Sequence, residues 1–468
     1  MVALSFVVFA LFVRRAHVAK VRSRHDLLAS ALVGWIAHPV VVWSIRLAAL
    51  ALFVVTILAG LFGVQNPYRN IAPTLVWIVW WVGLVYVQAF VGDIWSFINP
   101  WRTIYDVADQ CCRRVARGRE LSLRLPYPQA LGAWPACLLL LAFAWIELIY
   151  PGASVPRHIA CLAIAYSILT WTGTLAFGRD AWLRHGEVFT LAFGTLARFA
   201  PTEGVAGRLH LRPFGAGLLD GQPVSTSMVA FVLLLLAIVL YDGLSATGEW
   251  AMLVNALRPM LPDVDGKAMV TAIKTAGLLA ISLVFLTAYI GVSAVMSMVA
   301  GGRPGTLDVA RAFALTLVPI AIGYHVAHYL AYLITQGQLI IPLLSDPFGY
   351  GWNLIGTAGY RVDIGLVGAR FAWYAAVVAI VGGHVGAVYL AHVRAVGVFA
   401  NPGIALRTQV PLTALMVVYT FIGLSITAEP IVESQTTAAP PTPMAAESTV
   451  NPPDPVAPKP KDGEPSRP

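Results

Sequence analysis

Charged side chains are scarce in this sequence of 468 residues. Asp, Glu, Lys and Arg make up 12% of the chain and hydrophobic residues 58%, whereas an average soluble domain carries about 25% charged residues. A water-soluble surface cannot be built from so few charges. Apolar runs of about 18 residues or more recur along the chain, which is the length that a helix needs to cross a hydrocarbon layer about 30 Å thick. The composition therefore predicts a polytopic membrane protein.

Several other features are missing as well. The sequence has four cysteines, Cys111, Cys112, Cys137 and Cys161, and because two of them fall inside apolar runs they form no disulfide framework. The glycine-rich stretches lack the spacing of Walker and dinucleotide-binding loops, so no nucleotide site is indicated. The formal net charge of +8 does not indicate nucleic acid as a partner, since the basic residues lie beside apolar runs and not in a folded basic domain.

Ten apolar segments predict an all-α fold, a polytopic membrane helix bundle of about ten transmembrane helices within residues 1–427. Alternate threading of these segments places most of the 31 Lys and Arg residues on one side. The positive-inside rule assigns that side to the cytoplasm and leaves both termini outside. The expected location is the bacterial cytoplasmic (inner) membrane. The segments are Met1–Val13, Val41–Phe62, Thr74–Val91, Ala130–Ile149, Ile159–Phe177, Val224–Tyr241, Thr275–Val299, Ala312–Ile334, Phe371–Val393 and Val410–Ile426.

Two further segments need a different interpretation. Trp182–Ala200 is apolar, but counting it as a span would place the later basic loops outside. We therefore interpret it as a helix lying in the interface or as a re-entrant piece. Residues 428–468 are rich in proline and have too little apolar surface to fold, so they are predicted to form a disordered tail.

Histidines inside the apolar runs are the first functional candidates, because ionisable groups in a bilayer are costly. His325 and His328 share one face of the eighth predicted helix, and His384 lies in the ninth. His325 and His384 fall near the midplane of their helices. We predict a metal site formed by His325, His328 and His384, holding a divalent transition metal such as zinc, iron or copper. The alternative is packing, since histidine in a helix bundle often hydrogen-bonds a neighbouring helix.

Carboxylates on the same outer half of the bundle are the candidate catalytic groups. Each is suited to be an extra metal ligand, a partner of an imidazole, or a general base. These residues are Glu147, Asp242 and Asp346.

Several longer strings are distinctive. They are NIAPTLVWIVWWVGL (70–84), GDIWSFINPWRT (92–103), GYHVAHYLAYLITQGQ (323–338), SDPFGYGWNLIGTA (345–358), GGHVGAVYLAHVRA (382–395) and LMVVYTFIGL (415–424). In these strings, and from about Leu61 to Leu424, the chain resembles a family of bacterial integral membrane proteins named fenitrothion hydrolases. The resemblance implies a membrane-embedded hydrolase of organophosphate triesters, with a second membrane protein subunit as a potential partner.

Three functions stay open at this point. The first is a metal-dependent, phosphotriesterase-like hydrolase of an apolar ester or organophosphate triester that arrives through the lipid bilayer, in which the metal supplies hydroxide. The second is a redox membrane subunit that binds haem between His325 and His384. The third is a transporter or permease, which intramembrane histidines and kinked helices also fit.

Overall fold

The computed structural model describes residues 1–12, 24–26, 34, 38–205, 208–221, 223–258, 265–399 and 401–428. The predicted tail lies outside the described residues, apart from Ala428, which ends the last helix. Helices make up most of the described chain, in line with the predicted fold class. Among the residues that the structure describes, eight helical segments are long and apolar enough to cross a membrane by length and composition.

These eight segments follow eight of the predicted runs. The other two predicted spans form shorter helices, α1 (Val2–Phe12) of 11 residues and α9 (Trp134–Leu148) of 15 residues. The long segments are α4 (Pro39–Phe62); α5 (Ile71–Pro73), η1 (Thr74–Gly83) and α6 (Leu84–Phe90); α10 (Pro156–Phe177); α14 (Thr226–Ser245); α16 (Gly266–Val299); α17 (Thr306–Phe313), η3 (Ala314–Leu317), α18 (Val318–Gln336), η4 (Gly337–Leu339) and α19 (Ile340–Ser345); α20 (Ala369–Val398); and α21 (Pro402–Ala428).

Shorter elements form the connections between these segments. They are α7 (Trp95–Ile98), α8 (Pro100–Val115), α11 (Arg179–His185), α12 (Val188–Ala197), α13 (Ala216–Leu219), α15 (Gly248–Leu257), η5 (Ile364–Leu366) and the strands β1 (His25–Asp26), β2 (Thr202–Val205) and β3 (Arg208–Leu211).

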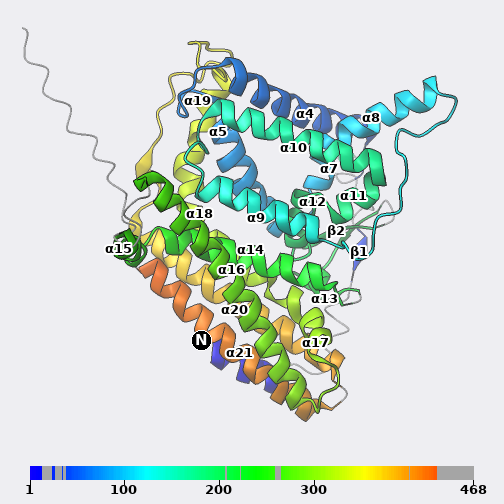
Figure 1. Cartoon of the computed structure of the whole chain (residues 1–468), viewed down its shortest axis with the longest axis vertical. Coiled ribbons are helices and arrows are strands. Elements are labelled where there is room, and N and C mark those ends of the chain that lie inside the picture. The colour runs from blue at the N-terminus through cyan, green and yellow to red at the C-terminus, as the bar shows by residue number, and fades with distance from the viewer. Residues whose placement is uncertain are drawn as a thin grey trace, which may run out of the picture.

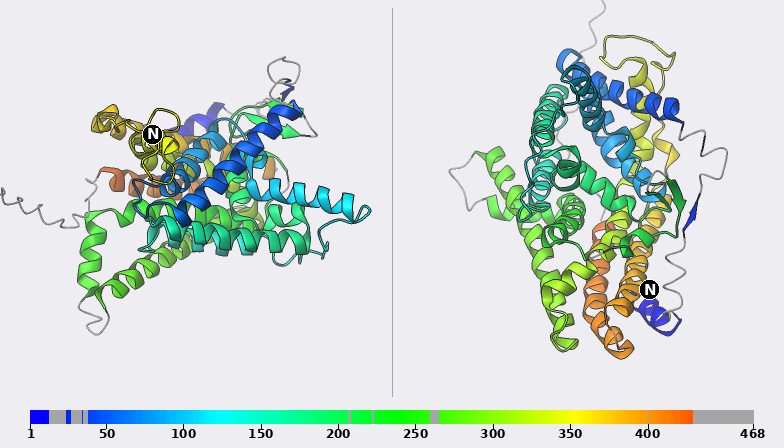
Figure 2. Two further views of the ribbon diagram at one scale, coloured as in Figure 1. Left: turned by 90° about the horizontal axis from the view of Figure 1, so that it is seen from above. Right: turned by 90° about the vertical axis from the view of Figure 1, so that its right-hand side faces the viewer.

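The helices form two groups, with α9, α14 and α18 where the groups meet (Figure 1). α4 packs on α10 in one group, and α20 packs on α21 in the other. The side view in Figure 2 shows the same division along the long axis. The outer faces carry exposed apolar side chains such as Leu47, Leu283, Val378 and Phe421, which is consistent with a lipid bilayer around the molecule.

Contacts between loops agree with the order of the spans. Strand β3 pairs with both β1 and β2 in antiparallel fashion, which joins two segments that the threading places on the basic side. At the opposite end, the backbone N–H of Arg157 donates to Gln65, and Arg69 donates to the carbonyl of Gly349. This three-stranded sheet is a small addition to the predicted all-α fold.

The segment Trp182–Ala200 forms two short helices instead of one. α11 ends at His185, and the ten residues of α12 are too few to cross a membrane. α12 packs against α6, α7 and α9, and most of its residues are buried. It therefore fits the re-entrant interpretation better than the interfacial one.

Glu187 starts α12 as a buried N-cap. Its carboxylate accepts hydrogen bonds from the backbone N–H of Phe189 at 3.0 Å and of Thr190 at 2.7 Å. The hydroxyls of Tyr166 and Thr190 donate to it as well. The side chain thus satisfies helix-end N–H groups that would otherwise lie unpaired in the apolar interior.

Candidate functional site

Asp242 lies in the last turn of α14, facing α18. Its Oδ2 atom is 3.0 Å from Nε2 of His328, and the hydroxyl of Tyr329 donates to the same oxygen. The rings of His328 and Tyr329 lie edge to face, with their centroids 4.7 Å apart. Two consecutive side chains of α18 therefore hold one carboxylate of α14.

Glu147 extends this group from a third helix, α9. Its carboxyl group lies beside the Trp81 indole and within electrostatic range of Asp242 and Tyr329. Glu147 thus lies within electrostatic range of Asp242 on the packed helices α9 and α14, and the imidazole of His328 contacts Asp242 from α18. Ionisable groups so placed in a membrane helix bundle are functional candidates, because burying them without a role is unfavourable.

His325 lies one turn before Tyr329 on α18, and the two ring centroids are 4.8 Å apart. Its Nε2 is 3.1 Å from the carbonyl oxygen of Val82, near the end of the π-helix η1. π-Helical windings are rare and are frequently found at functional sites. We define the Asp242 cluster as Glu147, Asp242, His325, His328 and Tyr329.

The Asp242 cluster is partly accessible. The side chains of Asp242 and His328 are 19% and 26% exposed, whereas α18 is buried from Val318 to His325. Exposure therefore begins within the cluster and continues along α18 to Tyr332, which is 44% exposed.

His328 and Asp242 have the arrangement of a general base with its orienting carboxylate. With Asp242 ionised, Nε2 of His328 carries the proton donated to the carboxylate, and the lone pair is on Nδ1. Nδ1 faces Gly243, where an added Cβ would lie 3.9 Å away. The same position lies 3.1 Å from Cγ2 of Ile426, so an apolar side chain of α21 also borders the surroundings of this nitrogen. Fixing the tautomer in this way is how a carboxylate prepares a catalytic histidine.

His384 lies apart from the Asp242 cluster. Its ring packs against Tyr324 and Tyr419, with centroids 6.1 and 5.5 Å away. Tyr324 and His325 are consecutive on α18, so their side chains point in directions about 100° apart. One faces His384 and α21, and the other faces η1.

The predicted metal set of His325, His328 and His384 is therefore not brought together. In the described part of the chain, no group of three or more His, Cys, Asp or Glu side chains is placed to hold a metal ion. The physical reason is the direction of the side chains on α18. Tyr324 points toward His384, and the next residue, His325, points toward η1 instead.

The space for haem between His325 and His384 is also lacking in this structure. α18 and α20 cross in backbone contact at Gly323 and Gly383. A Cβ on Gly323 would lie 2.5 Å from the carbonyl oxygen of Ala379, and one on Gly383 would lie 2.5 Å from that of Pro319. A macrocycle would have to separate the two helices.

Asp346 serves the loop after α19 and is not a member of the Asp242 cluster. Its carboxylate accepts hydrogen bonds from the backbone N–H of Tyr350 at 2.9 Å and of Gly351 at 2.6 Å. Gly349 and Gly351 have φ values of 78° and 87°, a conformation that favours glycine. Of the three predicted carboxylates, the structure brings Asp242 and Glu147 near each other and uses Asp346 in a turn.

Tyr329 is the member of the cluster that the sequence analysis missed. Its position directly after His328 was the available signal, because a tyrosine hydroxyl in an apolar helix needs a partner.

In comparisons with protein-family models, curated proteins and solved structures, no match to this chain was found.

Proposed function

We propose that this chain is a membrane-embedded hydrolase of an apolar ester or organophosphate triester, with His328 as its general base. The observation that carries the proposal is the pair of His328 and Asp242, 3.0 Å apart and partly exposed between apolar helices. The resemblance to the fenitrothion hydrolase family, which includes the string around His328, points to the same class of reaction.

The proposed reaction uses water as the nucleophile. Nδ1 of His328 takes a proton from a water molecule while the water oxygen bonds to the carbonyl carbon or phosphorus of the substrate. The bond to the leaving alkoxide or phenoxide breaks, and the leaving oxygen takes the proton from the imidazolium. Asp242 orients the imidazole and stabilises its positive charge, and Tyr329 fixes Asp242.

This proposal differs from the metal-dependent reaction expected from the sequence. Because His384 faces away from His325 and His328, water activation is assigned to an imidazole and a carboxylate, without a three-histidine metal site. The substrate is apolar in this proposal because the helices around the cluster present apolar faces, so a substrate dissolved in lipid reaches it directly.

Hydrolysis of p-nitrophenyl acyl esters and of dialkyl p-nitrophenyl phosphates by protein purified into nanodiscs tests the proposal. Wild type is expected to release p-nitrophenol, and His328→Ala is expected to lower kcat/KM by about 10²–10⁴-fold, the usual contribution of a general base. His158→Ala is the matched control, because His158 is exposed and lies outside the Asp242 cluster. Equal rates for wild type and His328→Ala would overturn the proposal.

A proton-coupled transporter is the second candidate. The observation that favours it is the proximity of two carboxylates, Glu147 and Asp242, inside the helix bundle. Carboxylate and histidine chains of this kind carry protons in membrane pumps and transporters. Substrate-driven proton uptake in proteoliposomes, together with no hydrolysis by wild type, would favour this function over the hydrolase.

A further inference from the structure

A second polar group, remote from the Asp242 cluster, lies at the basic end of the molecule. Three arginines from three elements surround one carboxylate: Arg46 of α4, Arg102 of α8 and Arg179 of α11 all face Asp106. We call these three residues the arginine triad. It belongs to the side on which the sequence places most of the basic residues.

The carboxylate of Asp106 does not satisfy the arginine triad. Arg179 pairs closely with Asp106, at 2.5 Å, and also with the exposed Asp180. Arg46 and Arg102 approach Asp106 only to 4.0 Å, which is too long for a hydrogen bond. Their Nε atoms are buried and have no hydrogen-bond partner among the described residues.

The charges of the arginine triad act on one another. Burial, and then the positive charges of Arg179 and Arg46, lowers the pKa of Arg102, although Asp106 opposes this effect. Three guanidinium groups face two carboxylates, so positive charge is in excess. Arginine is the residue of choice for binding phosphate, because its planar donors match the phosphate oxygens.

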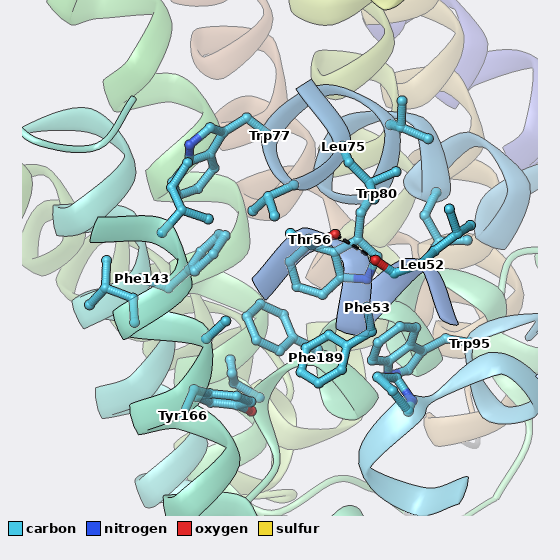
Figure 3. A pocket seen from close by; sticks show the side chains of 18 of the residues that line it. Leu52, Phe53, Thr56, Leu75, Trp77, Trp80, Trp95, Phe143, Tyr166 and Phe189 are labelled. Atoms are coloured by element: carbon cyan, nitrogen blue, oxygen red, sulfur yellow. Dashed lines mark hydrogen bonds between the residues drawn. The ribbon is translucent and has the colours of Figure 1, made fainter. Parts of the chain in front are cut away.

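A large apolar cavity opens next to the arginine triad. It has a volume of about 830 Å³, within the range of small-molecule sites. Aromatic side chains from α4, η1, α9, α10 and α12 surround it, as Figure 3 shows for Phe53, Trp80, Phe143, Tyr166 and Phe189.

The triad and the cavity share the same elements. On α4, Ala49 and Phe53 line the cavity, three and seven residues after Arg46, so all three share one helix face within about 10 Å. On α8, Pro100 and Trp101 line the cavity directly before Arg102. The arginine triad therefore lies at one end of the apolar cavity and gives that end a positive charge.

One donor inside the cavity lacks a partner. Trp95, which is 3% exposed, lines the cavity, and its indole N–H has no hydrogen-bond partner in the described part of the chain. A buried donor of this kind suits an acceptor on a ligand, such as the carbonyl of an acyl ester.

We propose that the arginine triad and the aromatic cavity together form a binding site for an anionic phospholipid, with the phosphate at Arg46 and Arg102 and an acyl chain in the cavity. A lipid fits better than free phosphate because the charged group adjoins a chamber of apolar side chains. Anionic lipids also face the basic side of a membrane protein. The site is separate from the Asp242 cluster and does not depend on its function.

Binding of one phosphatidylglycerol or one phosphatidylcholine to delipidated protein, measured by native mass spectrometry, tests the lipid site. Wild type is expected to bind phosphatidylglycerol at least about tenfold more tightly, and Arg46→Gln/Arg102→Gln is expected to abolish this preference. Arg114→Gln is the matched control, since Arg114 is an exposed arginine of the same helix. No preference in wild type, or an unchanged preference in the double variant, would overturn the proposal.

Two further arms separate the headgroup from the chain. Ala163→Phe fills the cavity, and we expect it to weaken long-chain phosphatidylglycerol about tenfold or more while the dihexanoyl form is little affected. Inorganic phosphate at millimolar concentration is expected to leave phosphatidylglycerol bound. Full displacement by phosphate alone would assign the arginine triad to a soluble anion and would contradict the lipid site.

Discussion

Asp242→Asn is expected to lower kcat/KM for ester or phosphotriester hydrolysis by about 10²–10⁴-fold. Asparagine keeps the shape of the side chain, but His328 and Tyr329 both contact Oδ2 of Asp242. With the amide nitrogen in that position, the N–H₂ group donates to Nε2 of His328 and to the hydroxyl oxygen of Tyr329, which places the imidazole proton on Nδ1. The nitrogen beside Gly243 would then have no lone pair with which to take a proton from water.

The effect of Asp242→Asn should be catalytic and not structural. The temperature of unfolding in detergent is expected to stay close to that of wild type, because no atom is lost. Asp346→Asn is the matched control, since this carboxylate serves a loop outside the cluster and its substitution should leave kcat/KM unchanged. If Asp242→Asn kept most of the wild-type rate, Asp242 would have no part in orienting His328.

Glu187→Ala is expected to destabilise the protein by about 2–5 kcal/mol. The fully buried carboxylate of Glu187 accepts hydrogen bonds from two backbone N–H groups of α12 and from two hydroxyls. Alanine leaves these four donors unpaired in an interior without water. The loss would appear as a lower temperature of unfolding in detergent, followed by tryptophan fluorescence.

Glu187→Gln tests the loss of the charge and of one acceptor oxygen while the volume of the side chain stays nearly the same. Glutamine keeps one acceptor oxygen and nearly the same volume, so we expect it to lose clearly less stability than alanine. Similar unfolding temperatures for the alanine variant and for wild type would show that α12 needs no buried cap.

The helices of this protein follow from its apolar runs. The run Val41–Phe62 becomes α4 (Pro39–Phe62), and Thr74–Val91 becomes the segment from α5 to α6, because backbone groups in lipid must be satisfied within a helix. The sequence did not predict the π-helical winding of η1 or the division of Trp182–Ala200 into two helices. The glutamate at position 187, directly before an apolar run, was the local signal for the second helix.

The candidate site could be predicted only in part. Hydropathy singles out Asp242, Glu147 and His328 as ionisable residues in apolar surroundings, and in the structure His328 contacts Asp242 while Glu147 lies within electrostatic range of it. Which histidines share a face with which neighbour depends on how α18 is rotated against η1, α14 and α20. If α18 were rotated about its axis by one residue, about 100°, His325 would face His384 instead of Val82. The order of residues within one apolar run does not determine this rotation.

The measurement that tests the central claim most directly is a double-mutant cycle on kcat/KM with His328→Ala, Asp242→Asn and the double variant. If Asp242 acts only through His328, the two residues form one unit, and we expect the double variant to be no slower than His328→Ala within about threefold. Losses that multiply in the double variant would mean that the two residues act independently, and this would contradict a His328–Asp242 general base.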